Sequence, residues 1–214
     1  MAVLLDSASL DEAAAAAELG FVRGITTNPA LMAKETGEPL AHLERLLAVF
    51  PHGPVCYQPT RSSFAEMDRQ ARAAAVLAPE RVVAKLPATL DAVKLAAGLV
   101  EEGMRCALTA VYSPAQALLA HEVGCTWIIP YVDRAARHAS GGLEVLEALA
   151  ATLARLQSST RILAASLKSP GQVADAVLHG SHDVTAPLDV LRALTAHPLT
   201  ESAVRDFETA WTTP

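Results

Sequence analysis

Residues 82–87 of this chain read Val82-Val83-Ala84-Lys85-Leu86-Pro87, a short apolar and β-branched run that carries a single lysine. Such a run predicts a buried strand, which Pro87 is expected to end just past the lysine. An ammonium group buried at Lys85 loses its hydration, and this favours the neutral amine, a nucleophile that can form a Schiff base with a carbonyl group. The alternative is a lysine at a strand end that reaches solvent or pairs with a carboxylate.

Similar runs recur through the chain with helical stretches between them. We count eight runs, at residues 3–5, 24–26, 55–58, 82–85, 106–109, 127–131, 162–166 and 183–185. The segments 63–77, 90–101 and 143–156 have the 3.6-residue period expected of crossover helices. Eight strand-then-helix units in sequence predict an α/β fold, namely a single (β/α)8 TIM barrel over residues 1–214.

A further helix is expected after the eighth unit, from about Glu201 to Trp211, within the C-terminal segment 199–214. Its Val204, Phe207 and Trp211 recur at i, i+3 and i+7 and form an apolar stripe. This stripe needs a partner, which is either the barrel or another subunit.

Composition and charge argue against several classes of protein. The chain of 214 residues has a formal net charge of -6 and no long basic run, which argues against nucleic acid as a partner. Its cysteines, Cys56, Cys106 and Cys125, are irregularly spaced, so neither a disulfide framework nor a zinc pattern is expected, and a reducing cytoplasm fits. Residues 1–6 lack a basic leader, and no apolar run reaches the ~18 residues of a membrane span, so we expect neither a signal peptide nor a membrane partner.

Polar residues close most of the apolar runs, at the strand ends where parallel barrels carry their chemistry. They are Asp6, Thr26 with Asn28, Gln58, Lys85, Thr109, Tyr131 and Ser166. Each alone has a structural alternative: Asp6 could cap the first helix, Thr26 and Asn28 could form a turn, and Tyr131 could be a core tyrosine bonded to the backbone. Their convergence on a buried lysine favours the catalytic interpretation.

Schiff-base chemistry requires groups that move protons near the nitrogen and near a substrate hydroxyl. Asp6 can accept a proton. Gln58 does not titrate, but together with Thr109 and Tyr131 it could hold a water molecule that relays one. Substrate binding is expected of the remaining polar residues, Thr26, Asn28 and Ser166.

Two segments at neighbouring strand ends suggest a phosphate site. Arg134 and Lys168 supply positive charge, while Ser166 and backbone N–H groups of the following turn supply directional donors. Asp133 adds a negative charge beside Arg134. The alternative is a pair of exposed basic residues without a ligand.

Five segments of the chain resemble the small transaldolases and fructose-6-phosphate aldolases. They are Gly24-Ile25-Thr26-Thr27-Asn28-Pro29, Val82-Val83-Ala84-Lys85-Leu86-Pro87-Ala88-Thr89, Leu108-Thr109-Ala110-Val111-Tyr112 with Ala115-Gln116, Pro130-Tyr131-Val132-Asp133-Arg134, and Ala164-Ala165-Ser166-Leu167-Lys168. The resemblance runs from Leu5-Asp6 to the residues 207–211, which is essentially the whole chain.

The resemblance implies a class I aldolase-type enzyme without metal or cofactor. Lys85 would bind the carbonyl of a ketose or ketose phosphate and hold a dihydroxyacetone unit, which is passed to an aldose by a transaldolase or released by an aldolase. It also implies a homo-oligomer, a pentamer or decamer, in which the C-terminal helix docks on a neighbouring subunit.

Two positions bear on the branch of the family. Transaldolases typically carry glutamate where Gln58 stands, and many carry phenylalanine where Tyr131 stands, so both residues resemble the aldolase branch. Pro59 and the pair Cys56-Tyr57 fit neither branch well. Transfer and release therefore both stay open, and the competing class is a sugar-phosphate-binding barrel that keeps the fold without catalysis.

Overall fold

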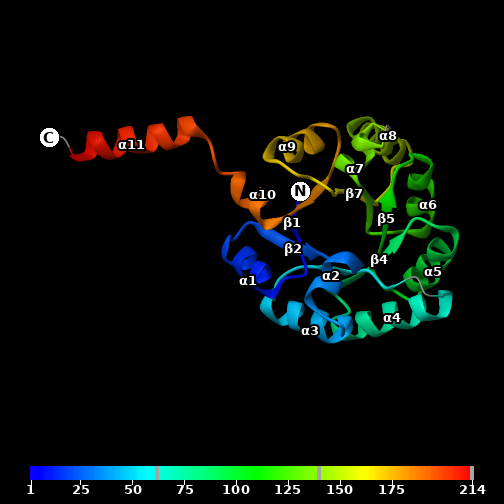
Figure 1. Ribbon diagram of the computed structural model, residues 1–214. Helices are drawn as coiled ribbons and strands as arrows, with labels where there is room; N and C mark the ends of the chain where they lie inside the picture. The colour runs from blue at the N-terminus through cyan, green and yellow to red at the C-terminus, as the bar shows by residue number, and fades with distance from the viewer. Residues whose placement is uncertain (61–62, 139–140, 213–214) are drawn as a thin grey trace.

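The computed structural model describes residues 1–60, 63–138 and 141–212. In this part of the chain, eight parallel strands pair in sequence order and close into a barrel ringed by helices (Figure 1). The strands are β1 (Val3–Asp6), β2 (Val22–Thr26), β3 (Val55–Tyr57), β4 (Val82–Pro87), β5 (Cys106–Val111), β6 (Trp127–Pro130), β7 (Arg161–Ala164) and β8 (Asp183–Ala186). The predicted (β/α)8 TIM barrel is confirmed.

Helices follow each strand, and most of them cover the outer face of the barrel (Figure 1). They are α1 (Leu10–Glu18), α2 (Pro29–Glu35), α3 (Pro39–Val49), α4 (Phe64–Leu77), α5 (Leu90–Glu101), α6 (Ala115–Val123), α7 (Val132–Arg137), α8 (Gly142–Arg155), α9 (Pro170–Leu178), α10 (Leu188–Ala193) and α11 (Pro198–Thr212). Within the described ranges, no helix has both the length and the apolar character needed to cross a membrane.

Two of the helices that begin where the strands finish, α2 and α9, each combine a polar cap with a proline. The Asn28 side chain accepts a hydrogen bond from the Leu31 N–H at 3.0 Å and starts α2. The Ser169 hydroxyl accepts one from the Gln172 N–H at 3.2 Å and starts α9. Each cap is followed by a proline at the first helical position, where the missing N–H costs nothing.

The interior of the barrel is filled in layers, because successive side chains of a strand alternate between its two faces. From the N-terminal end upward, alternation gives the layers Gly24, Val83, Trp127 and Asp183; Leu4, Cys56, Ala107 and Leu163; Thr26, Lys85, Ile129 and Thr185; Asp6, Gln58, Thr109 and Ala165. The lower layers are mostly apolar and the upper ones mostly polar. Polar chemistry is therefore concentrated at one end of the barrel.

Asp183 closes the opposite end of the barrel with a buried polar network. Its carboxylate accepts hydrogen bonds from Ala2 N at 2.6 Å, Trp127 Nε1 at 2.9 Å, and Arg161 Nε and Nη2 at 2.8 Å each. Burial by itself raises the pKa of Asp183, but the hydrogen bonds from Arg161, Trp127 and Ala2 outweigh it and leave the pKa below its ordinary value.

The three cysteines are buried free thiols. Burial raises the pKa of Cys56 to about 11 and the pKa values of Cys106 and Cys125 to about 12 each. Cys56 lies inside the barrel, whereas Cys106 and Cys125 belong to the core between strands and helices. All three are therefore protonated at neutral pH.

The helix α11 projects away from the barrel (Figure 1). Its apolar residues are open to solvent, with Phe207 72% and Trp211 92% exposed. The apolar stripe of Val204, Phe207 and Trp211 was expected to pack on the barrel or on another subunit, and the barrel of the same chain does not cover it. Residues 213 and 214 of the expected segment 199–214 lie outside the described residues.

Candidate active site

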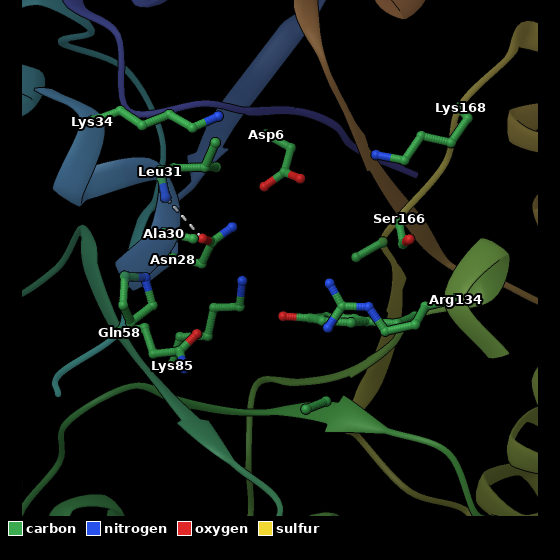
Figure 2. Close-up of a pocket in the computed structure, with 14 residues that line it drawn as sticks. Asp6, Asn28, Ala30, Leu31, Lys34, Gln58, Lys85, Arg134, Ser166 and Lys168 are labelled. Carbon is green, nitrogen blue, oxygen red and sulfur yellow. Dashed lines mark hydrogen bonds between the residues drawn. The ribbon is translucent and has the colours of Figure 1, made fainter. Parts of the chain in front are cut away.

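A pocket of about 490 Å³ lies at the C-terminal ends of the strands. Eight of the ten predicted site residues line it: Asp6, Asn28, Gln58, Lys85, Tyr131, Arg134, Ser166 and Lys168. Figure 2 shows Asn28 and Lys85 on one side and Ser166 and Arg134 on the other. The remaining two, Thr26 and Thr109, are fully buried and hydrogen-bond to Asp6 and Tyr131, which line the pocket.

Lys85 points from β4 into this pocket and is 2% exposed. Its Nζ donates a hydrogen bond to the Thr27 carbonyl at 3.0 Å, and it forms no ion pair within the described residues. The side chain therefore neither reaches bulk solvent nor pairs with a carboxylate, the two alternatives for a strand lysine. Thr27 is itself held in place, because its N–H and its hydroxyl both donate to the Cys56 carbonyl.

Asp6 does not cap the first helix; Ser9 does. Instead the Asp6 carboxylate accepts a hydrogen bond at 2.9 Å from the hydroxyl of Thr26 on the neighbouring strand. The Thr26 Oγ1 also lies 2.7 Å from Thr185 Oγ1 on β8. Asp6 thus ends a chain of hydrogen bonds at the pocket wall.

The hydroxyl oxygens of Thr109 on β5 and of Tyr131, which follows β6, are 3.3 Å apart. The Tyr131 hydroxyl therefore contacts a side chain, not the backbone. The Oε1 atom of Gln58 is buried and has no hydrogen-bond partner among the described residues. Ala110, which also lines the pocket, has φ of 56°, and the β5–β6 register shifts there.

Arg134 lies in α7 with its guanidinium carbon 4.9 Å from the centroid of the Tyr131 ring. The neighbouring Asp133 forms an ion pair with Arg137, one helical turn further on, at 2.9 Å. Asp133 therefore does not neutralise Arg134. The arginine remains available to an anion in the pocket and is held against the tyrosine by a cation–π contact.

Ser166 and Lys168 lie in the turn between β7 and α9. Ser166 has φ of 62°, a left-handed conformation that is uncommon for a residue other than glycine and is enriched at functional sites. The Lys168 N–H donates to Gln172 Oε1 at 2.7 Å, which ties the turn to the first turn of α9. Both side chains face the pocket beside Arg134 (Figure 2).

Lys34 is a pocket residue that the sequence reasoning missed. It extends from the last turn of α2 over the pocket, on the side opposite Lys168 (Figure 2). Three of the four lysines in the sequence, Lys34, Lys85 and Lys168, line this one pocket, and Asp6 is the carboxylate among its lining residues. A chain of net charge -6 thus gathers positive charge where a substrate would bind.

Among the described residues, no group of three or more His, Cys, Asp or Glu side chains is placed to hold a metal ion. A closed parallel barrel with a polar, cationic pocket at its C-terminal end is typical of (β/α)8-barrel enzymes that act on anionic molecules.

Comparison with known proteins makes the assignment specific. A family model described as Transaldolase/Fructose-6-phosphate aldolase matches residues 3–213. A probable transaldolase of Desulfosudis oleivorans is 36% identical over 211 residues, covering 99% of this chain and 98% of that protein. Probable transaldolases of Desulforapulum autotrophicum and Prosthecochloris aestuarii are each 34% identical, covering 99% and 97% of this chain and 97% and 96% of theirs.

The chain therefore belongs to the transaldolase/fructose-6-phosphate aldolase family, as its motifs predicted. The family and its named relatives make it an enzyme of aldolase or transaldolase type.

Proposed function

We propose that the chain is a class I enzyme that cleaves a ketose phosphate through a Schiff base on Lys85. The observation that carries this proposal is a lysine that is 2% exposed, lines the pocket and has no carboxylate partner in the described residues. A buried amine of this kind is suited to attack a carbonyl. The dihydroxyacetone unit is then either transferred to an aldose or released.

In the proposed reaction, Lys85 Nζ adds to the C2 carbonyl of the ketose, and the carbinolamine loses water to give an iminium ion. Asp6 takes the proton of the C4 hydroxyl, the C3–C4 bond breaks, and the aldose leaves with a new carbonyl group. The bonding electrons remain on the dihydroxyacetone unit as an enamine, which the iminium nitrogen stabilises. This enamine attacks an acceptor aldehyde, or it is protonated at C3 and hydrolysed from Lys85.

A water molecule is proposed to carry protons at the nitrogen. The buried Gln58 Oε1 needs a donor, and Tyr131, whose hydroxyl lies 3.3 Å from that of Thr109, lines the same pocket. One water bonded to these groups satisfies the amide oxygen and can move a proton during dehydration of the carbinolamine. The Oδ1 atom of Asn28 caps α2, and its Nδ2 is proposed to donate a hydrogen bond to a substrate hydroxyl.

The substrate phosphate is proposed to bind Arg134, Ser166 and Lys168. Asp133 is paired with Arg137, so the positive charge of Arg134 is not cancelled by its neighbour. Lys34 adds a cation on the opposite wall and is proposed to attract the anionic substrate into the pocket.

Borohydride trapping tests the covalent step. The chain is incubated with fructose 6-phosphate and reduced, and intact mass and peptide mapping are expected to show one sugar-derived adduct on Lys85. Lys85→Met keeps the apolar length and should abolish the adduct, whereas Lys94→Met, on the exposed side of α5, should retain it. An adduct that persists in Lys85→Met would falsify the assignment, and a chain that never becomes covalently reduced would support the non-catalytic binding barrel.

Product analysis separates the two reactions. Fructose 6-phosphate is supplied with and without an acceptor aldose phosphate, and the products are identified by mass. A transaldolase forms a new ketose phosphate only with the acceptor, whereas an aldolase releases free dihydroxyacetone without one.

We also propose that α11 packs on a neighbouring subunit of a pentamer or decamer. The exposed Phe207 and Trp211 give the helix an apolar face that its own barrel leaves uncovered. The mass in solution, measured by light scattering, should be that of a ring for the natural chain and of smaller species for Phe207→Ser/Trp211→Ser. Leu178→Ser, a substitution of an 80% exposed residue on α9, is the control and should not change the mass.

A further inference from the structure

We infer that Thr185, on the eighth strand, is a positioning residue that orients the Asp6 carboxylate through Thr26. This inference rests on the proposed role of Asp6 as the proton acceptor in carbon–carbon bond cleavage. The three residues come from adjacent strands, since β1 lies between β8 and β2. Leu4 pairs with Thr185 across one side of β1, and Asp6 pairs with Thr26 across the other.

The direction of each hydrogen bond follows from the chemistry of the groups. An ionised carboxylate can only accept, so the single hydroxyl proton of Thr26 is donated to Asp6 Oδ1, at 2.9 Å. Thr26 Oγ1 then has no proton for Thr185, whose oxygen is 2.7 Å away. Thr185 must therefore be the donor in that contact, and the order is Thr185 to Thr26 to Asp6.

Burial makes this order strict. Thr26 is 0% and Thr185 1% exposed, so bulk water does not compete for either hydroxyl. Both residues share an interior layer with Lys85, directly beneath the layer of Asp6. Hydrogen bonds in series polarise one another, so the hydrogen bond that Thr26 accepts from Thr185 makes Thr26 the better donor to the carboxylate.

The arrangement leaves one oxygen of Asp6 for the reaction. Oδ1 is bound by Thr26, whereas Oδ2 has no hydrogen-bond partner among the described residues. The carboxylate faces the centre of the pocket (Figure 2). The hydrogen bond from Thr26 to Oδ1 holds Oδ2 where it can accept a proton from a substrate hydroxyl. A carboxylate free to rotate would spend less time in that orientation.

Thr185→Val is the direct test because valine matches the shape of threonine and removes only the donor. The turnover number for fructose 6-phosphate cleavage should fall about threefold to tenfold, the size of effect expected from one lost hydrogen bond. KM should stay within twofold, because substrate binding has not changed. When dihydroxyacetone itself is added and reduced with borohydride, its adduct on Lys85 should form as in the natural chain, because the nucleophile has not changed. Thr185→Ser retains the hydroxyl and should restore turnover.

Two controls separate positioning from loss of stability. Thr160→Val removes a buried hydroxyl that donates to Ala120 and Cys125 carbonyls, so it should lower the melting temperature without lowering turnover. In a Thr26→Val background, Thr185→Val should have no further effect on turnover, because the chain is already broken. This double-mutant comparison remains informative even if Thr185→Val is less stable.

The outcomes are distinct. If the natural chain forms no Lys85 adduct, the proposed function fails before Thr185 is tested. If the adduct forms and turnover is measurable, but Thr185→Val matches the natural chain or the two threonine substitutions act additively, the positioning role is overturned and the proposed function stands. A Thr185→Ser variant as slow as Thr185→Val would also overturn it.

Discussion

Replacing Asp183 with asparagine should lower the stability of the barrel by an amount that follows from its contacts. Each carboxylate oxygen accepts two hydrogen bonds: Oδ1 from Ala2 N and Arg161 Nη2, and Oδ2 from Trp127 Nε1 and Arg161 Nε. An asparagine keeps one acceptor oxygen and places an NH2 group at the other position. Whichever way the amide is turned, two of the four bonds are lost, and an N–H group faces other donors.

The magnitude is about 3 kcal/mol. Hydrogen bonds to charged groups contribute about 1.5–3 kcal/mol each, and the lower end applies because the Arg161 side chain is 43% exposed. With an unfolding entropy of about 2.1 cal/mol/K per residue, a chain of 214 residues loses about 7 °C in melting temperature. Turnover by the folded variant should be unchanged, because Asp183 lies at the opposite end of the barrel from Lys85.

Thermal unfolding followed by circular dichroism checks this prediction across pH. The pKa of Asp183 is lowered by folding, so the unfolded chain binds more protons in the acid range, and the stabilisation is complete at neutral pH and lost as the pH falls through the folded-state pKa. The gap between the natural chain and Asp183→Asn should therefore narrow in acid. Asp175→Asn, an exposed change on α9, is the matched control. An Asp183→Asn melting temperature within a degree of the natural one, or a gap that is the same in acid, would refute the reasoning.

Three substitutions test the pocket. Gln58→Glu places a titrating acid where an amide is proposed to hold water, so the ratio of transfer to release should change; an unchanged ratio and unchanged rates would exclude Gln58 from the reaction. Arg134→Ala should raise KM for a phosphorylated sugar roughly tenfold to a hundredfold and spare the unphosphorylated one; equal penalties would make Arg134 structural. Lys34→Ala should raise KM at low ionic strength and raise it less in salt. Lys94→Ala removes the same charge away from the pocket and should leave KM unchanged. Identical effects of the two substitutions would mean that only the net charge of the protein matters.

The strands could be predicted because each is a short apolar run whose composition differs from that of its flanking helices. The predicted runs 55–58, 127–131 and 162–166 extend past the observed strand ends, and each run closes on a residue with a polar group, namely Gln58, Tyr131 or Ser166. The short helix α7 was not predicted, since six residues are too few to show a helical period. The left-handed backbone conformation of Ala110 could not be predicted, because no glycine marks the position.

The candidate site could be located from sequence because the chain direction of a parallel barrel brings all strand ends together. Two residues near the pocket were not predicted. Lys34 lies on a helix and follows no apolar run. Thr185 closes the predicted run 183–185, as Thr26 closes 24–26, so it carried the same signal but was not singled out. The pairing of Asp133 with Arg137 did carry a signal, namely the i, i+4 spacing of opposite charges.

The rates at which the three buried cysteines react with a thiol reagent report how often the structure around each of them opens. A thiol reagent attacks the thiolate, so each protonated, enclosed sulfur reacts only when the structure around it opens. Cys106 and Cys125 are reached when helices leave the barrel wall, whereas Cys56 is reached only when the strands separate. The unmodified chain, mixed with one chromogenic disulfide, should therefore report peripheral and central opening as separate rates, with and without substrate.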